Sequence, residues 1–366
     1  MKNELSIPEN IPRLCVDDMI QFLTCAYTNL LDKKAPVKTL PTVMLWSAPG
    51  LGKSQGIRQL ADRLSQTTKR ETRVTDVRLL LFNPVDLRGI PVADAKRKAA
   101  VWLKPQIFDM DPSDQLLNIL FLDEISSAPP SVQAAAYQLV LDRTVGEHRL
   151  PDNCLVIAAG NRVYDRSVAW QMPQALANRL CHLEIICDPV RWRRWAIANQ
   201  IHPLVLGYIA QRPDQLHAAG DDELAFPTPR TWEMVSQILH YVGNNEAGHT
   251  LISGCIGRGS ATEFRTMTDL FDQIPPLETI FSGRCSKVPK KPDTLYVLTS
   301  AMSSYALSHR HDLTAIGHSI TYALRFPPEF TTLLLQDYIS FEPTYRSHLM
   351  GIPAFSDWIS RYGKLL

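Results

Sequence analysis

The chain has 366 residues, of which 45% are hydrophobic and 20% charged, and its formal net charge is +1. This length exceeds one ordinary hydrophobic core, so we expect two or three folded units in a globular protein. A net charge near zero argues against a global basic field of the kind that attracts nucleic acid or an anionic membrane.

The N-terminus has no basic segment followed by an apolar core, and no uncharged apolar run reaches the ~18 residues of a membrane helix. We therefore expect neither a secretory signal nor a membrane segment. The seven cysteines are scattered and form no CxxC pair, which argues against a disulfide framework or a thiolate metal site. Together these features indicate a cytoplasmic protein.

The first 40 residues are predicted to form an irregular arm and one helix, from about Val16 to Leu31. An α/β domain is expected from residue 41 to residue 189, where short apolar runs alternate with helical stretches. Continuous apolar strands are typical of a parallel sheet that is covered on both faces. Five such runs are predicted strands: Val43–Trp46, Arg78–Phe82, Ile119–Leu122, Cys154–Ala159 and Cys181–Cys187. The helix after the first strand has an apolar stripe formed by Ile57, Leu60, Ala61 and Leu64.

The segment Ser47-Ala-Pro-Gly-Leu-Gly-Lys-Ser54 lies between the first strand and this amphipathic helix. A glycine-rich loop in that position binds phosphate, because backbone N–H groups and the positive end of the helix converge on the oxygens. Lys53 is expected to contact the β- and γ-phosphates, and Ser54 to bind Mg²⁺. Ser47 replaces the usual first glycine, at the cost that serine reaches positive φ less readily. The predicted nucleotide-binding residues are Pro49, Gly50, Leu51, Gly52, Lys53, Ser54 and Asp123.

Two carboxylates, Asp123 and Glu124, end the third predicted strand. In a parallel sheet this end of a strand faces the ligand crevice. We expect Asp123 to lie beside the magnesium, through a water, and Glu124 to polarise the attacking water as a general base. Asn161 directly follows the next strand, where its amide can orient that water or contact the γ-phosphate; a plain turn residue is the alternative.

The pattern changes after Asp188-Pro189. Residues 190–280 are predicted to form a helical domain, and residues 281–366 a further helical extension whose role the sequence does not indicate. Within the first of these, Thr228 is the predicted N-cap and Pro229 the first residue of a helix that carries Arg230.

In this order, the segments SAPGLGKS, ILFLDE and VIAAGN resemble the AAA+ ATPases. Three further segments resemble the MoxR-type branch, which is related to the dynein-type ATPase domains. They are a turn that opens an inserted hairpin, a second hairpin before the sensor strand, and a helix ending in Asn-Arg: Asn83–Pro91, Asp142–Pro151 and Pro173–Leu180. The similarity covers residues 40–235, and the last part of the chain resembles no family that we can name.

The resemblance implies a three-layer αβα P-loop core followed by a helical lid, with ATP and Mg²⁺ as cofactors. It implies that Arg179 is an arginine finger acting on ATP held by a neighbouring subunit, with Arg162 and Arg166 as alternatives. Arg230 would be the lid arginine that points at the γ-phosphate. Arg179 can instead be a solvated helix-end residue or one that caps a helix C-terminus, and Arg230 a surface residue of an ordinary helix that starts with proline. The inserted hairpin has a basic tip, Lys96-Arg-Lys98, that is either solvated or in contact with substrate.

The function implied is that of an ATPase, hydrolysing ATP to ADP and phosphate, and acting as a remodelling chaperone. A homo-hexameric ring would mature or activate a partner protein, commonly one with a von Willebrand factor A-type domain. Alternatives are a DNA-associated AAA+ motor or loader, an ATP-gated scaffold with little turnover, and a small-molecule kinase. The near-zero charge counts against the motor, the Asp123-Glu124 pair against the scaffold, and Asn161 with the two arginines against the kinase.

Overall fold

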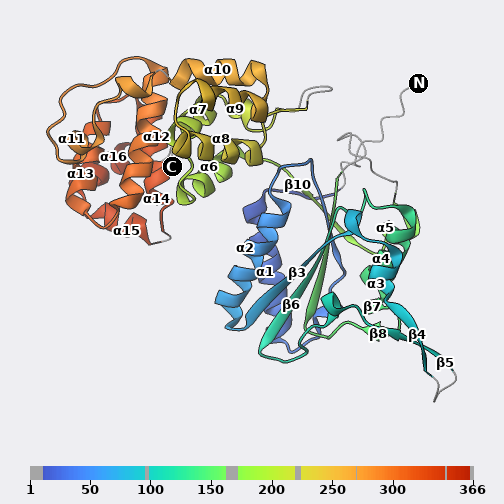
Figure 1. Ribbon diagram of the computed structural model, residues 1–366. Helices are drawn as coiled ribbons and strands as arrows, with labels where there is room; N and C mark the ends of the chain where they lie inside the picture. Colours follow the sequence, from blue (N-terminus) through green and yellow to red (C-terminus); the bar gives the residue numbers. More distant parts are fainter. Residues whose placement is uncertain are drawn as a thin grey trace. The chain divides into compact units, whose positions relative to one another are not determined.

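The computed structural model describes residues 11–94, 99–161, 172–218, 224–268, 270–342 and 344–362. The chain divides into two compact units, Met1–Ile186 and Cys187–Leu366 (Figure 1). The first unit is an α/β structure and the second is helical. Among the described residues, no helix combines the length and the apolar character needed to span a membrane.

A six-stranded parallel sheet lies at the centre of the first unit, in the order β1-β10-β2-β9-β6-β3. Every neighbouring pair in it is parallel, so all the strands end at one edge of the sheet. The strands are β1 (Arg13–Leu14), β2 (Val43–Trp46), β3 (Glu71–Arg78), β6 (Leu116–Asp123), β9 (Cys154–Gly160) and β10 (Cys181–Ile185).

Helices cover both faces of this sheet (Figure 1). On one face, α1 (Val16–Asp32) and α2 (Lys53–Thr68) share a core with Leu45 of β2, and on the other α4 (Pro130–Asp142) shares a core with Met44. Successive strand residues point to opposite faces, so β2 contributes to both cores. The whole apolar stripe predicted for α2 is buried. The prediction of a three-layer α/β fold with helices after it is confirmed.

The second predicted strand, Arg78–Phe82, is wrong. The strand is β3, eight residues of mostly polar character that end at Arg78, and Leu79–Leu81 forms a short 3₁₀ helix. β3 is an edge strand that pairs with β6, so it does not need the continuous apolar sequence of a central strand. The opposite edge strand, β1, was not predicted, and it joins part of the N-terminal arm to the sheet.

Two hairpins lie outside the sheet, as the sequence predicts. One is formed by β4 (Ile90–Asp94) and β5 (Ala99–Leu103), and the other by β7 (Thr144–Val145) and β8 (His148–Arg149); both are antiparallel. A short helix, α3 (Pro84–Arg88), leads into the first hairpin. The basic tip at residues 96–98 lies outside the described residues.

The second unit is built from helices around two apolar cores. Trp232 lies in one core and Tyr338 in the other, and α12 contributes to both, through Val297 and Leu298. The helices are α6 (Pro189–Ala198), α7 (Pro203–Gln211), α8 (Pro229–Tyr241), α9 (Glu246–Ile256), α10 (Arg258–Thr268), α11 (Leu277–Phe281), α12 (Pro292–Ser308), α13 (Leu313–Ala323), α14 (Pro328–Ile339), α15 (Tyr345–Met350) and α16 (Pro353–Tyr362).

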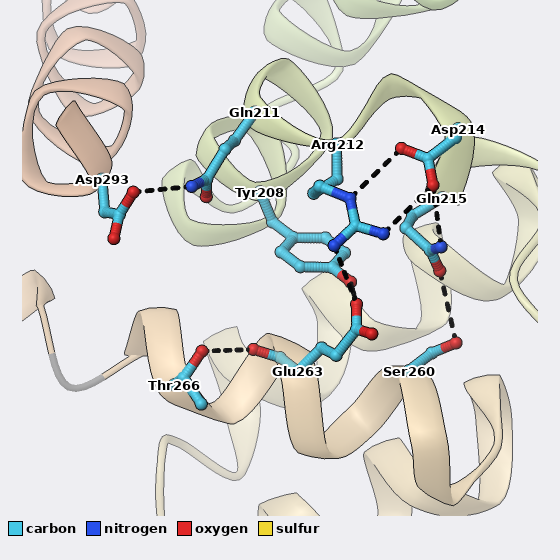
Figure 2. Close-up of polar contacts among 9 residues, drawn as sticks. All are labelled: Tyr208, Gln211, Arg212, Asp214, Gln215, Ser260, Glu263, Thr266 and Asp293. Atoms are coloured by element: carbon cyan, nitrogen blue, oxygen red, sulfur yellow. Dashed lines mark hydrogen bonds and ion pairs between the residues drawn. The ribbon is translucent and has the colours of Figure 1, made fainter.

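Two ion-pair networks in this unit differ in burial. Arg193 and Asp337 form a buried pair, with Nη2 2.7 Å from Oδ2 and Nε 2.9 Å from Oδ1, and the Ser303 hydroxyl also donates to Oδ2 at 2.6 Å. Arg212 instead forms exposed ion pairs with Asp214 and Glu263, which Figure 2 shows as dashed lines. Only the first network is shielded from water and salt.

Candidate functional site

The candidate site lies where three adjacent strands of the sheet end. β2 runs into the loop Ser47–Gly52, β9 into Asn161, and β6 ends at Asp123. The helix α2 begins at Lys53, so its N-terminus opens directly onto this edge. Gly50 and Gly52 have φ of +83° and +87°, a region that residues with a Cβ rarely adopt. The predicted phosphate loop therefore has the backbone shape that its glycines allow.

Lys53 connects the loop to the end of β9. Its Nζ lies 2.7 Å from the Ser47 hydroxyl oxygen, 3.2 Å from the Ser47 carbonyl oxygen and 3.0 Å from Asn161 Oδ1. Because an ammonium group only donates, the Asn161 side chain must present its oxygen to Lys53. The structure thus brings together two residues that lie 108 positions apart in the chain.

Ser47 does not carry the conformational cost that the sequence suggested. The described non-glycine residues with positive φ are Lys34, Lys69, Glu124, Arg143 and Gln200, and Ser47 is not among them. Its buried hydroxyl accepts from Lys53 and donates to the Ala48 carbonyl at 2.8 Å. A glycine at this position would lack the hydroxyl that helps to place Lys53.

Ser54 and Asp123 form the possible magnesium site. The Ser54 hydroxyl donates to Asp123 Oδ2 at 3.0 Å, and Asp123 Oδ1 accepts from the Glu124 backbone N–H at 2.9 Å. Hydroxyl and carboxylate oxygens suit Mg²⁺, which keeps several waters and commonly shares substrate phosphates. The described residues contain no cluster of three or more His, Cys, Asp or Glu side chains that would hold a metal by itself. These two residues therefore fit a magnesium that is bound together with a nucleotide.

Glu124 has a left-handed backbone conformation, with φ of +58°. Three backbone hydrogen bonds hold this conformation. The Ile125 N–H donates to the Ala159 carbonyl at 2.9 Å, and the N–H groups of Ser127 and Ala128 donate to the Glu124 carbonyl. A bulky residue in this region is strained, and such strain concentrates at active sites. The strained backbone is a reason, separate from the sequence motif, to test Glu124 as a functional residue.

Ser126 is a residue of the site that the sequence analysis missed. Its buried hydroxyl accepts from the Asn161 N–H at 2.9 Å and donates to the Asn161 carbonyl at 3.1 Å. Gly160 permits this approach, since a Cβ there would lie 2.8 Å from Ser126 Oγ. Ser126 thus fixes the backbone of Asn161, and no sequence pattern identifies it.

Asp76 of β3 was also missed, because its strand was predicted at the wrong place. Burial raises the pKa of Asp76 above its ordinary value, and the neighbouring Asp123 carboxylate adds to the shift. A second acidic group therefore lies close to the possible magnesium site and contributes to its negative field.

The candidate arginines lie on the surface of their units. Arg179 is exposed in the turn after α5 (Gln174–Ala177), and its side chain has no hydrogen-bond or ion-pair partner in the described part of the chain. Arg162 and Arg166 lie outside the described residues. In the second unit, Arg230 is the exposed second residue of α8, whose predicted N-cap is confirmed because Thr228 Oγ1 accepts from Thr231 N–H.

Residues 42–182 match the model of the ATPase family associated with various cellular activities (AAA). The match covers the α/β core, less than half of the chain, and supports the resemblance at the level of this family but not of its MoxR-type branch. No curated protein gives a significant match.

Similar solved structures include PCH-2 of C. elegans, with 15% identity, a TM-score of 0.35 and coverage of 80% of this chain and 69% of that one. A chain of an E. coli HORMA:CdnC:Trip13 complex has 14% identity, a TM-score of 0.39 and coverage of 65% and 85%. A mutant RuvB of Thermotoga maritima has 15% identity, a TM-score of 0.34 and coverage of 91% and 88%. At such TM-scores these similarities carry no argument about this chain.

Proposed function

We propose that the protein is an AAA+ ATPase that hydrolyses ATP to ADP and phosphate. One observation carries the proposal. At the N-terminus of α2, Lys53 donates a hydrogen bond to Asn161 and Ser54 donates one to Asp123, so that the start of this helix is linked to the ends of two adjacent parallel strands. Backbone N–H groups of a glycine loop and a helix N-terminus favour a polyphosphate there. The family match of residues 42–182 supports the same class.

Each residue has a distinct part in the proposed reaction. Lys53 and the loop N–H groups hold the phosphates, while Ser54 and Asp123 hold the Mg²⁺ site, Asp123 through a water. When bound, Mg²⁺ neutralises charge that develops on the phosphate oxygens. Glu124 takes the proton of the attacking water, and Asn161 orients that water or the terminal phosphate. Glu124 is half-buried beside the site, in a backbone conformation fixed by its neighbours.

The exposure of Arg179 supports its role as a finger that serves the site of a neighbouring subunit. Hydrolysis then requires assembly, and we propose a homo-hexameric ring in the cytoplasm. Arg230, on the second unit, is proposed as the lid arginine that reaches the γ-phosphate. The sequence resemblance to MoxR-type ATPases supports a remodelling role on a protein client, such as one with a von Willebrand factor A-type domain.

Steady-state hydrolysis and binding of a fluorescent ATP analogue in three variants test this proposal. Lys53→Ala is expected to lose nucleotide binding, because it removes the cation at the phosphate loop. Glu124→Gln is expected to bind ATP, to trap assembled rings and not to turn ATP over. Arg179→Ala is expected to bind ATP but not hydrolyse it, and to regain activity when mixed with Glu124→Gln. Normal turnover by Glu124→Gln would refute the assignment of the base.

A further inference from the structure

The His182 side chain bridges two segments of the first unit. The Trp46 indole Nε1 lies 2.9 Å from His182 Nδ1, and His182 Nε2 lies 2.8 Å from the Ala177 carbonyl oxygen. The Trp46 and His182 rings are stacked, with their centroids 6.0 Å apart and 17° between their planes. Both ring nitrogens of His182 are therefore engaged by partners that lie on different elements.

The partners determine the tautomer of His182. An indole N–H only donates, so Nδ1 must accept and carries no proton. Nε2 then carries the proton of the neutral ring and donates it to the Ala177 carbonyl, which only accepts. The bridge consequently needs one acceptor and one donor at fixed positions on the same side chain.

The two ends of the bridge lie next to parts of the candidate site. Trp46 is the last residue of β2 and precedes Ser47, whose hydroxyl accepts from Lys53. Ala177 is the last residue of α5, and its carbonyl also accepts from Leu180 N–H at 3.2 Å, which closes the turn that holds Arg179. His182 thus ties the turn of the exposed arginine to the strand that leads into the phosphate loop.

We propose that His182 is a positioning residue that sets the place of Arg179 relative to the sheet, and hence its reach into the site of an adjoining subunit. This inference rests on the proposed function, in which Arg179 acts on a neighbour. His182 contacts neither the loop residues 48–54 nor the acidic pair within the described hydrogen bonds. Loss of its bridge is therefore expected to impair the contribution to the neighbouring site and to leave nucleotide binding by the same subunit intact.

Three substitutions separate the two ends of the bridge. His182→Leu removes both hydrogen bonds at similar bulk, while His182→Gln keeps one acceptor and one donor. Trp46→Phe removes only the indole N–H. A misplacement of about 1 Å costs on the order of 10²-fold in rate, so we expect a kcat loss of that order in His182→Leu. His182→Gln should recover most of this loss, Trp46→Phe should lose less, and the affinity for a fluorescent ATP analogue should stay unchanged.

Mixed rings of the full-length protein give the decisive readout. His182→Leu subunits mixed with Glu124→Gln subunits should regain turnover, because the second subunit supplies a correctly placed Arg179 to the intact site of the first. Arg179→Ala mixed with Glu124→Gln is the control for action across subunits. If the control recovers and His182→Leu does not, the role of His182 is refuted and the proposed function stands. If the control also fails, action of Arg179 on a neighbour is refuted, and this inference with it. Weakened nucleotide binding by His182→Leu, or equal loss in His182→Gln, would also overturn the inference.

Discussion

Replacing Ser126 with alanine tests whether the backbone of Asn161 must be held in place for catalysis. The substitution removes the acceptor of the Asn161 N–H and the donor to the Asn161 carbonyl, at 2.9 and 3.1 Å, and leaves the rest of the strand ends unchanged. Asn161 Oδ1 also accepts from Lys53, so a shift of Asn161 changes the position of both groups.

The loss of the Ser126–Asn161 hydrogen bonds sets the size of the expected effect on kcat. A hydrogen-bonding group left without its partner costs ~1–3 kcal/mol. If this energy holds Asn161 in its reactive position, its loss appears in the barrier, and kcat falls about 5- to 160-fold, since each 1.36 kcal/mol is tenfold. Nucleotide affinity should change less than kcat, because the loop and Ser54 are untouched.

The assay is steady-state ATP hydrolysis beside binding of a fluorescent ATP analogue and thermal unfolding. Ser127→Ala is the matched control, since the neighbouring Ser127 side chain makes no hydrogen bond within the described residues. We expect Ser127→Ala to keep wild-type kcat. Wild-type kcat in Ser126→Ala, or an equal loss in both variants, would show that these two hydrogen bonds do not position a catalytic group.

Three further predictions concern stability. Glu124→Gly should relieve the left-handed strain and stabilise the first unit by ~1 kcal/mol while abolishing turnover, so a melting temperature below wild type would refute the strain argument. Asp337→Ala should destabilise the second unit by ~3–5 kcal/mol, because Arg193 stays buried without its partner. Asp214→Ala, at an exposed ion pair, should cost less than ~1 kcal/mol. Similar melting temperatures of the two variants would contradict this prediction. Burial, with a smaller effect of His240, lowers the pKa of His202 to about 4. Between pH 6.5 and pH 4 the unfolded chain therefore binds a proton at His202 that the folded chain does not. The free energy of unfolding is expected to fall by up to ~1.4 kcal/mol per pH unit as the pH drops through this range. His202→Asn, which can still cap α7, should flatten that dependence in chemical denaturation, and an unchanged slope would refute it.

Elements with strong periodicity could be predicted from the sequence because their pattern reflects their own burial. β2 has the predicted bounds, and α1 differs from its predicted helix only at the C-terminal end. β3 could not be predicted, since an edge strand with one neighbour tolerates a polar sequence, and the nearby run Leu79–Leu81 is more apolar without being a strand. β1 gave no signal either, because two residues are too few for any period.

The residues of the candidate site that could be predicted from the sequence are those that lie in local patterns, and the residues that act through distant contacts could not be predicted. Glycines before Lys53 and acids after an apolar strand form local patterns, because a phosphate-binding loop of this kind uses consecutive residues. Ser126 and His182 act through contacts with residues 35 and 136 positions away, and serine and histidine are common in many other roles. The contacts of both residues depend on which strands become neighbours, and that is known only once the sheet is formed.

Lys53 shows how the loop and the end of β9 can respond to a phosphate together. Its ammonium group donates to neutral oxygens of Ser47 and Asn161. A phosphate oxygen carries negative charge, and its Coulomb attraction to the ammonium group adds to the hydrogen bond that it accepts. In the proposed reaction, a phosphate that takes over the Lys53 ammonium group would remove this partner of Asn161 Oδ1, while Ser126 would still hold the Asn161 backbone. The Asn161 amide would then be held at a fixed place to orient the attacking water, so that phosphate binding would prepare the proposed site.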